Sequence, residues 1–301
     1  MTEKIRVSLL GLGSMGTAMA TKLLEQGFDV DVWNRSPKEI GDLLDLGARK
    51  VDLGAALQND FFISMLSNDA AALEVFDDAN LVAAKPGAIH INMSTLSPTA
   101  SKTLADRHDQ LGLGYVAAPV LGRPAAILNG KLLIVAAGKA EQVAAAEVVL
   151  SKVSAQHWNV GEDHAKSLLV KLGVNYNLIH ALQAIGESVA LVESGGVDPN
   201  TFVEIITHTA FTGSAYTGYG PMIVNHNYTP PGFSIALGLK DVKLVEDAAA
   251  DLNLKLPVAG VLSLHRLQVR GAQIDTVTAP DGKTFRPSLF VTLTCPSYGR
   301  V

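Results

Sequence analysis

Apolar and polar residues alternate in blocks along the first half of the chain, and the blocks have the lengths of strands and helices. Short apolar runs that end in glycines or polar turns are typical of buried parallel strands, and longer segments between them have helical spacing. Such alternation favours an α/β domain with a doubly wound, mostly parallel sheet, which we place at residues 1–161. The pattern predicts strands at 5–10, 28–33, 61–66, 88–93, 115–120 and 132–137, and helices at 17–26, 70–76 and 99–111.

The pattern changes after Gly161. Residues 165–194 contain no proline and keep a helical pattern for about 30 residues, well beyond the usual length of a globular helix. Two glycines at 195–196 end this helix. We therefore expect an all-α domain at residues 162–301 that begins with a long interdomain helix. Its further helices are predicted at 198–209, 233–252 and 258–269, with a glycine-rich stretch at 212–220 and a tail at 278–301 that has no functional interpretation.

The first predicted strand runs directly into GLGSMG at residues 11–16, and a predicted helix follows. G-x-G-x-x-G between a strand and a helix is the fingerprint of a Rossmann dinucleotide-binding domain. In it, Gly11 allows a tight turn, Gly13 lets the backbone approach the pyrophosphate, and Gly16 lets the helix lie close to the strand. Ser14 and Met15 complete the candidate cofactor loop, and the helix N-terminus supplies N–H groups for the phosphates.

The end of the second predicted strand indicates which dinucleotide binds. NAD-selective sites usually carry Asp or Glu about 20 residues past the glycines, where the carboxylate binds the ribose 2′-OH. Here Asn34, Arg35 and Ser36 follow the strand, and no carboxylate stands there to repel a 2′-phosphate. The Arg35 guanidinium suits a phosphate and Ser36 adds a hydroxyl, so we expect NADP(H) as the cofactor. The alternative is that Arg35 only stacks on the adenine from a solvated loop.

Composition narrows the class of protein. The 301 residues are 48% hydrophobic and 18% charged, with a formal net charge of −5, as expected for a soluble globular enzyme of two domains. No basic tract suggests nucleic acid, and no apolar run reaches the roughly 18 residues of a membrane span. The single cysteine, Cys295, cannot form an internal disulfide, which together with the missing signal peptide favours the cytoplasm. No cluster of His, Cys and Asp has metal-ligand spacing, so we expect no metal.

Lys171 and Asn175 stand at i and i+4 on the long predicted helix, so they share one face. An ammonium can donate a proton to a forming alkoxide or accept one in reverse, while a carboxamide orients the substrate oxygen. A lysine and an asparagine on one helix face are most often solvated. The leucines and valines around them favour partial burial and a catalytic role here.

Several further motifs follow in a fixed order: GLGSMG, VWNRSP at 32–37, NMSTLSP at 92–98, AAPVLG at 117–122, K-x-x-x-N at 171–175 and LKD at 239–241. In this order and spacing they resemble the β-hydroxyacid dehydrogenases, over residues 4–275. That family includes 3-hydroxyisobutyrate dehydrogenases, tartronate semialdehyde reductases and glyoxylate or succinic semialdehyde reductases. The imine reductases share its architecture and its N-terminal half.

The resemblance implies roles residue by residue. Lys171 matches the catalytic lysine of the family, and Asn175 matches its substrate-orienting asparagine. Lys240 matches a lysine near the nicotinamide and the substrate, Thr95 a residue beside the nicotinamide, and Met65-Leu66 the loop over the adenosine ribose and pyrophosphate. Simpler interpretations stay open: Lys240 could pair with a carboxylate, Thr95 could satisfy its own turn, and Met65-Leu66 could belong to the core.

The segment at 117–123 departs from the family pattern Asp-Ala-Pro-Val-Ser-Gly-Gly. Leu121 replaces the serine that helps to hold the substrate carboxylate, and Arg123 replaces a glycine. Arg123 could bind a carboxylate itself or point to solvent. Together with Ser94 and Gly122, these residues are the candidate substrate contacts.

Other residues also have two interpretations. His164 and Lys166 stand where the family usually has glycines ahead of the long helix, and His164 could titrate or be structural. Tyr216 and Tyr219 could line a substrate pocket or pack in the core.

These features predict an NADP(H)-dependent oxidoreductase that transfers a hydride between nicotinamide and a small β-hydroxyacid or semialdehyde, with Lys171 as general acid/base. One alternative is an imine reductase or reductive aminase; Lys171 argues against it, and the apolar Leu121 argues for it. A second alternative is a non-catalytic dinucleotide-binding scaffold, against which the presence of Lys171 and Asn175 argues. The long apolar helix and the family resemblance imply a homodimer or homotetramer.

Overall fold

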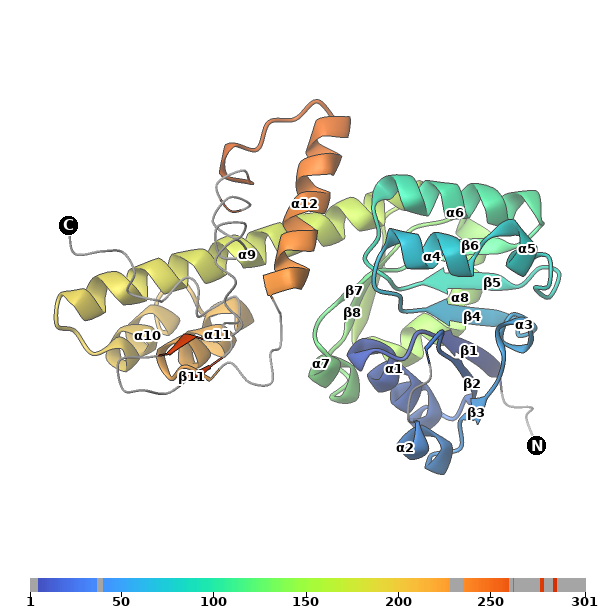
Figure 1. The fold of residues 1–301 in the computed structure, drawn as a ribbon, viewed down its shortest axis with the longest axis horizontal. Helices are drawn as coiled ribbons and strands as arrows, with labels where there is room; N and C mark the ends of the chain where they lie inside the picture. The colour runs from blue at the N-terminus through green and yellow to red at the C-terminus, as the bar shows by residue number, and fades with distance from the viewer. Residues whose placement is uncertain are drawn as a thin grey trace. The chain divides into compact units, whose positions relative to one another are not determined.

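The computed structural model describes residues 5–36, 40–227, 235–259 and 262, together with 277–278 and 284–285. The chain divides into two compact units, Met1–Lys171 and Leu172–Val301. In Figure 1 the first unit runs from blue to yellow-green along the chain, and the second runs from yellow to red. The predicted boundary at residue 161 precedes the long helix, whereas this division falls inside it.

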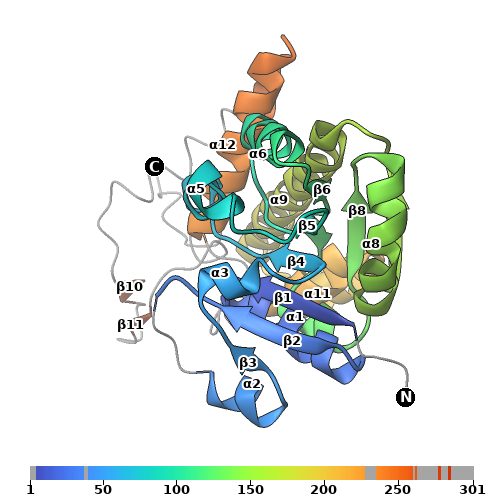
Figure 2. The same ribbon diagram turned by 90° about the vertical axis from the view of Figure 1, so that its right-hand side faces the viewer.

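The first unit is built on a 6-stranded sheet in the order β3-β2-β1-β4-β5-β6 (Figure 2). All neighbouring strands pair in parallel, which confirms the predicted doubly wound sheet. The order runs outward in both directions from β1 and β4, so their carboxyl ends form the switch point at which such sheets bind ligands. The strands are β1 (Arg6–Leu10), β2 (Asp29–Trp33), β3 (Arg49–Lys50), β4 (Phe61–Ser64), β5 (Ile89–Asn92) and β6 (Gly114–Ala117).

The central strands are buried on both faces because helices cover the sheet on both sides. On one face, Leu9 and Ile63 belong to a cluster with Met19 of α1 (Ser14–Glu25) and with α8 (Ala140–Val153). On the other face, Phe62 clusters with Leu104 of α6 (Pro98–Gln110) and with α4 (Asp69–Val75). Figure 1 shows α4 and α6 on one side of the sheet and α1 on the other.

Side-chain caps mark the starts of several helices. Asp52, Asn68, Asp77 and Ser97 each accept a hydrogen bond from the backbone N–H three residues further on, as N-cap residues do. Pro98 then occupies the first turn of α6, as its place in the sequence predicts. The apolar pattern predicts neither α8 nor the short helices α2 (Gly41–Asp45), α3 (Leu53–Ala56), α5 (Asp78–Leu81) and α7 (Pro124–Leu128).

The prediction of a single strand at 115–120 is wrong, because this segment contributes to two sheets, the second of which has 3 strands. That segment is two strands, β6 in the main sheet and β7 (Val120–Leu121) in the second sheet. Pro119 separates them because a proline nitrogen cannot donate a ladder hydrogen bond. β7 pairs antiparallel with β8 (Leu133–Ala136), which lies within the strand predicted at 132–137. β8 pairs in parallel with β9 (Gln156–Asn159), a strand that no apolar pattern marks because it is mostly exposed.

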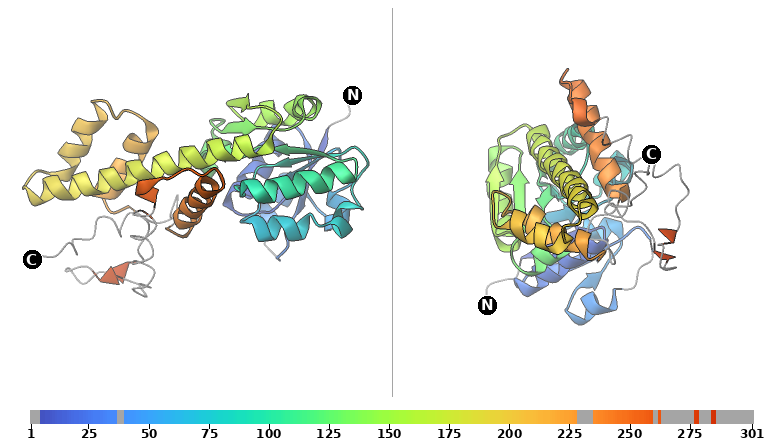
Figure 3. Two further views of the ribbon diagram at one scale, coloured as in Figure 1. Left: turned by 90° about the horizontal axis from the view of Figure 1, so that it is seen from above. Right: turned by 90° about the vertical axis from the view of Figure 1, so that its left-hand side faces the viewer.

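The second unit is helical. α9 (His164–Ser194) is one helix of 31 residues, which confirms the predicted long helix, and it contributes residues to both units. α10 (Pro199–Thr207) and α11 (Ser214–Val224) lie along its C-terminal half, where Ile185, Val203 and Ile223 cluster (Figure 3). α12 (Ile235–Asp251) joins α9 in a smaller cluster through Val242 and Ile179.

The sequence predicts a glycine-rich stretch between helices at 212–220, but residues 214–220 of this segment lie in helix α11. Gly213 is its N-cap residue, and Gly220 is buried inside it. A Cβ at Gly220 would lie 2.8 Å from Val203 Cγ1 of α10. The absence of a side chain at Gly220 therefore lets α10 and α11 pack closely, and the segment is helical.

Beyond α12, β10 (Val277–Thr278) and β11 (Thr284–Phe285) pair antiparallel within the tail. Most of the helix predicted at 258–269, and Cys295, lie outside the described residues. Among the residues that are described, no helix is long and apolar enough to cross a membrane.

Candidate functional site

The glycine loop between β1 and α1 has the geometry that its sequence predicts. Gly11 has a φ of +99°, a region that favours glycine, and its N–H donates to the Trp33 carbonyl oxygen at 2.9 Å. A Cβ at Gly16 would overlap the Gly11 carbonyl oxygen, so glycine lets the helix lie this close to the turn. A Cβ at Gly13 would meet no described atom within 4 Å, which leaves this position open to a ligand.

The N-terminus of α1 presents backbone N–H groups at this loop. Gly13 is the N-cap residue and has no side chain to accept a hydrogen bond from them. Gly13 and Ser14 are exposed, and Met15 is half-buried. The first-turn amides and the positive end of the helix dipole therefore suit an anion where the pyrophosphate is predicted.

Asn34 ties the turn after β2 to the glycine loop. Its Oδ1 accepts a hydrogen bond from the Leu12 N–H at 2.9 Å, and its Nδ2 donates to the Ser36 carbonyl oxygen at 2.8 Å. Arg35 and Ser36 are exposed, and the Arg35 guanidinium pairs with Glu74 at 2.6 Å. The structure thus places this turn beside the loop, while its contacts with a cofactor stay predictions.

The carboxyl ends of β4 and β5 bring two more predicted segments to the same edge of the sheet. Met65 lies against the glycine loop, since a Cβ at Gly11 would lie 2.5 Å from its carbonyl oxygen. The Leu66 N–H donates to Ser94 Oγ at 2.8 Å. Ser94 is buried, so its hydroxyl braces this loop from within, and the half-buried Thr95 follows it.

The segment that departs from the family pattern lies at the end of β7. Leu121 is half-buried, whereas Gly122 and Arg123 are exposed, and Arg123 is the N-cap residue of α7. Gly122 has a φ of +153°, and a Cβ there would lie 3.1 Å from that of Ala126. The substrate contacts expected of these residues stay predictions.

A buried polar group forms around Asn175. Lys171 and Asn175 lie one turn apart on α9, and each is 8% exposed. The Asn175 Nδ2 donates to Asp241 Oδ2 on α12 at 2.7 Å, and Asp241 is also buried. Lys240 Nζ lies 3.9 Å from the other carboxylate oxygen of Asp241. An ionised carboxylate only accepts hydrogen bonds, so this contact determines which end of the Asn175 carboxamide is the oxygen.

Two residues of these sites, Asp241 and Glu74, are not singled out by the sequence patterns. Asp241 is adjacent to Lys240 in the LKD motif, and this adjacency is the sequence feature that could have identified Asp241 as a site residue. Glu74 carries no signal of its own, because it lies 39 residues from Arg35 in the chain.

A buried polar network lies on the α6 face of the main sheet. His90 shares hydrogen bonds with His108 at 3.0 Å and with Ser64 Oγ at 2.8 Å, and Asn92 Nδ2 donates to the Tyr115 hydroxyl at 2.7 Å. Burial, and to a smaller extent the neighbouring His108, lowers the pKa of His90. Burial also lowers the pKa of His108 to about 4 and raises the pKa of Tyr115 to about 12. These groups are therefore uncharged near neutral pH.

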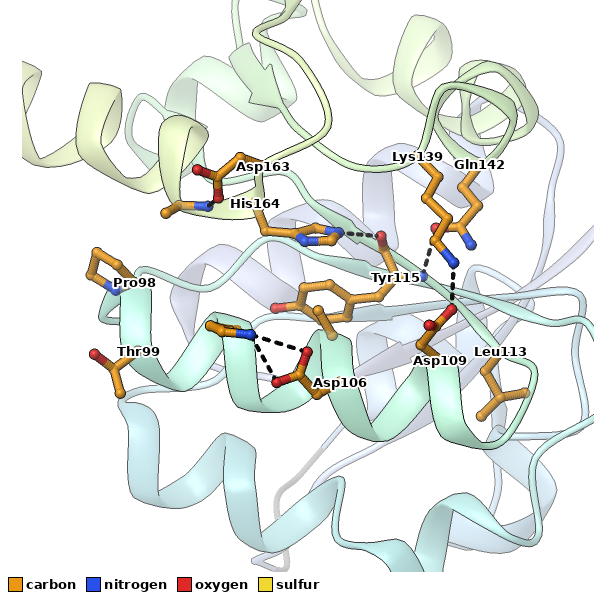
Figure 4. Close-up of a pocket in the computed structure, with 13 residues that line it drawn as sticks. Pro98, Thr99, Asp106, Asp109, Leu113, Tyr115, Lys139, Gln142, Asp163 and His164 are labelled. Atoms are coloured by element: carbon orange, nitrogen blue, oxygen red, sulfur yellow. Dashed lines mark hydrogen bonds and ion pairs between the residues drawn. The ribbon is translucent and has the colours of Figure 1, made fainter.

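A cavity of about 530 Å³ opens between α6, the start of α8 and the start of α9. Figure 4 shows Tyr115 and His164 at its centre, where His164 Nε2 donates to the Tyr115 carbonyl oxygen at 3.0 Å. Burial lowers the pKa of His164. The lysines of the cavity, Lys102 and Lys139, each pair with an aspartate of α6. None of the lining residues is a predicted cofactor, substrate or catalytic residue, and the contact of His164 favours its structural interpretation.

The remaining candidates also pack in the core. Tyr219 is buried in the cluster of α9, α10 and α11, and the Tyr216 ring lies 4.8 Å from that of Phe211. In the part of the chain that the structure describes, no group of three or more His, Cys, Asp or Glu side chains is placed to hold a metal ion.

Known families and proteins match both units. The NAD binding domain of 6-phosphogluconate dehydrogenase matches residues 6–161, and the NAD-binding domain of NADP-dependent 3-hydroxyisobutyrate dehydrogenase matches residues 166–270. An uncharacterized oxidoreductase of Bacillus subtilis (strain 168), YfjR, is 35% identical over 265 residues, which are 87% of this chain and 92% of that protein. Glyoxylate/succinic semialdehyde reductase 1 of Arabidopsis thaliana is 33% identical over 262 residues, 85% of this chain and 89% of that protein.

Solved structures share the architecture. The 3-hydroxyisobutyrate dehydrogenase (ygbJ) from Salmonella typhimurium matches with a TM-score of 0.83 at 22% identity, covering 95% of this chain and 99% of that one. An imine reductase from Pseudomonas sp. matches with a TM-score of 0.64 at 23% identity, covering 96% of this chain and 98% of that one. At these identities the likeness concerns the fold, and it confirms the predicted pairing of a Rossmann domain with a helical domain.

Proposed function

We propose a reaction for this chain, which belongs to the 3-hydroxyisobutyrate dehydrogenase family of NAD(P)-binding oxidoreductases. It transfers a hydride between NADP(H) and a small β-hydroxyacid or semialdehyde, with Lys171 as general acid/base. The observation that carries this proposal is the burial of Lys171 and Asn175 one turn apart on α9, with Asn175 held by Asp241.

Lys171 handles the proton in this reaction. When bound, a nicotinamide dinucleotide would supply the hydride for the reduction of a carbonyl group and would accept one in the oxidation of an alcohol. The Lys171 ammonium donates a proton to the carbonyl oxygen, so that the product is a neutral hydroxyl group. In the reverse direction the neutral amine accepts the hydroxyl proton.

Asn175 orients the substrate. Its Nδ2 donates to the Asp241 carboxylate, so the carboxamide cannot flip without bringing its own oxygen against another oxygen. The carboxamide is therefore held in one orientation, and its second Nδ2 hydrogen can donate to the substrate oxygen that Lys171 protonates. A polar group held in advance does not have to reorganise when the reaction occurs.

The choice of NADP(H) rests on the turn after β2. Asn34 stands in place of an acidic residue, and its hydrogen bonds to Leu12 and Ser36 hold the turn that carries Arg35. The exposed Arg35 guanidinium offers a fork for the 2′-phosphate. Arg35→Asp should weaken NADPH binding by about 10- to 100-fold, since contacts to charged groups are worth roughly 1.5–3 kcal/mol. Equal affinity of the wild-type protein for NADH and NADPH in a titration would contradict this choice.

A substrate panel tests the reaction and separates its alternatives. NADPH oxidation is followed with semialdehydes, with glyoxylate and with cyclic imines. Turnover of the carbonyl acids that depends on Lys171 supports the proposal. Turnover of imines alone would support an imine reductase, a possibility that the structural neighbours raise. NADPH binding without turnover of any compound would support a dinucleotide-binding scaffold.

We also propose that the chain is a homodimer or homotetramer. Several large apolar side chains of the second unit are exposed, more than a monomer in water easily leaves uncovered. They include Val174, Leu191, Ile205, Phe211 and Leu237. Light scattering at micromolar concentration should report a multiple of 31.7 kDa, and the mass of a single chain would contradict the proposal.

A further inference from the structure

The ion pair between Arg35 and Glu74 bears on the choice between the two dinucleotides. We propose that Glu74 lowers the preference for NADP(H) over NAD(H), because it holds the guanidinium that the 2′-phosphate needs. This inference rests on the proposed use of NADP(H) by Arg35. It concerns the affinity for the cofactor and not the chemical step.

The pair joins two segments that come from one edge of the sheet. Arg35 Nη1 donates to Glu74 Oε2 at 2.6 Å, a charge-assisted hydrogen bond. Arg35 follows β2, and Glu74 lies on α4, the helix that follows β4. Both segments thus follow the carboxyl ends of strands of the main sheet, on the side where the glycine loop also lies. The side chains are 59% and 65% exposed, so a dissolved ligand can reach both of them.

The stability of the fold does not explain a carboxylate at this position. Exposed ion pairs contribute little to stability, because water and salt screen them. Glu74 also lies in the last turn of α4, where a negative charge opposes the helix dipole. The carbonyl oxygens at that end already have a cation, since Arg107 donates to those of Leu73 and Phe76. The contact between Glu74 and Arg35 therefore contributes little to the stability of the fold.

The same contact has opposite consequences for the two cofactors. A phosphate monoester carries about −1.5 to −2 charges at pH 7, so Glu74 both competes with it for Arg35 and repels it. The turn cannot easily carry Arg35 away from Glu74, because the Asn34 side chain accepts a hydrogen bond from the Leu12 N–H and so holds the turn against the glycine loop. NAD(H) has only a hydroxyl at this position and leaves the ion pair intact. Glu74 therefore weakens the binding of NADP(H) selectively.

Glu74→Gln tests this inference, because glutamine keeps the shape of the side chain and removes its charge. NADPH and NADH are titrated into the full chain without substrate, and binding is followed by the fluorescence of the cofactor. We expect the variant to bind NADPH on the order of 3- to 10-fold more tightly than the wild type at low salt, from repulsion between exposed charges a few ångströms apart. The gain should shrink as added salt screens the charges, and the affinity for NADH should not change.

Asp60→Asn is the matched control. Asp60 also forms an exposed ion pair at 2.6 Å, with Lys85, and its replacement removes the same charge. It precedes β4 and so lies at the edge of the sheet opposite the glycine loop. This variant should bind NADPH as the wild type does.

Three results would overturn the inference: unchanged or weaker NADPH binding by Glu74→Gln, an equal gain for NADH, or an equal gain in Asp60→Asn. A wild-type protein that prefers NADH would instead refute the proposed cofactor, and the inference with it. The wild-type titration therefore tests the cofactor, and the ratio between variant and wild type tests Glu74.

Discussion

The dinucleotide end of the first unit and the buried Asn175–Asp241 pair of the second are built in opposite ways. The first consists of backbone amides and glycines between β1 and α1. The second consists of buried side chains, in which Asn175 donates to Asp241. Short local motifs specify the backbone-built site, whereas the side-chain site needs partners from two helices.

This difference determines how each region should respond to change. A backbone site tolerates new side chains except where a Cβ collides with a neighbouring chain segment. A buried side-chain site lies in a low dielectric, where the loss of one partner leaves another polar group unsatisfied.

The largest effect is expected at the buried Lys171, one helical turn before Asn175 on α9. Lys171→Ala should lower kcat on the best carbonyl substrate by roughly 10²–10⁴-fold, because it removes the general acid. Lys171→Arg should not restore activity, since a guanidinium hardly releases its proton at pH 7. Dinucleotide affinity, measured by titration, should stay at the wild-type value. Lys166→Ala, an exposed lysine on the same helix, is the control, and near wild-type turnover by Lys171→Ala would refute the mechanism.

Acid should destabilise the first unit through its buried histidines. His108 has a pKa of about 4 in the folded protein against 6.5 when unfolded, so the unfolded chain binds the proton first. The stability that the neutral imidazole contributes is complete above about pH 6.5 and is lost as the pH falls toward 4, by about 3 kcal/mol for this group. His90 acts in the same direction.

Urea unfolding measured from pH 7.5 downward checks this expectation. His208→Gln, which replaces an exposed histidine, should keep the wild-type profile. A free energy of unfolding that stays constant down to pH 4.5 would contradict the assignment of neutral buried histidines.

Alanine substitutions at Gly16 and Gly13 distinguish a glycine needed for packing from a glycine needed only for contact with the dinucleotide. Gly16→Ala should lower the free energy of unfolding by roughly 1–3 kcal/mol, because its Cβ would overlap the Gly11 carbonyl oxygen. It should weaken dinucleotide binding as well. Gly13→Ala should cost less than about 1 kcal/mol, as an N-cap change, and still weaken binding. Thermal unfolding measures the stability of both variants, and titration with the dinucleotide measures their affinity. Equal losses of stability in the two variants would contradict a packing role that belongs to Gly16 and not to Gly13.

The smallest effect is expected from Asp241→Asn. The carboxamide keeps the shape of the side chain but no longer dictates the orientation of Asn175. The loss of one hydrogen bond of roughly 1 kcal/mol should lower kcat by about 5-fold with Lys171 intact. Asp247→Asn, at an exposed position on α12, should leave kcat unchanged. A loss as large as that of Lys171→Ala would mean that Asp241 takes part in the proton transfer itself.

Much of the fold could be predicted because its signals are local. The strand, glycine loop and helix at the N-terminus follow one another in the chain, and Gly11 adopts the positive φ that its place requires. The long helix α9 follows from a pattern without proline, bounded by glycines. Some predictions were wrong because one residue type can have two structural roles. Pro119 divides a predicted strand, and Gly220 serves helix packing instead of a loop.

The sequence by itself determined the class of fold, the glycine loop, and the placing of Lys171 and Asn175 on one helical face, because spacing and backbone preferences act over a few residues. Only the tertiary structure decided the partners of the functional side chains. Asp241 lies 66 residues from Asn175 in the chain, and Glu74 lies 39 residues from Arg35. Their contacts depend on how whole helices and strands pack, and no local pattern of residue types encodes which distant side chains meet.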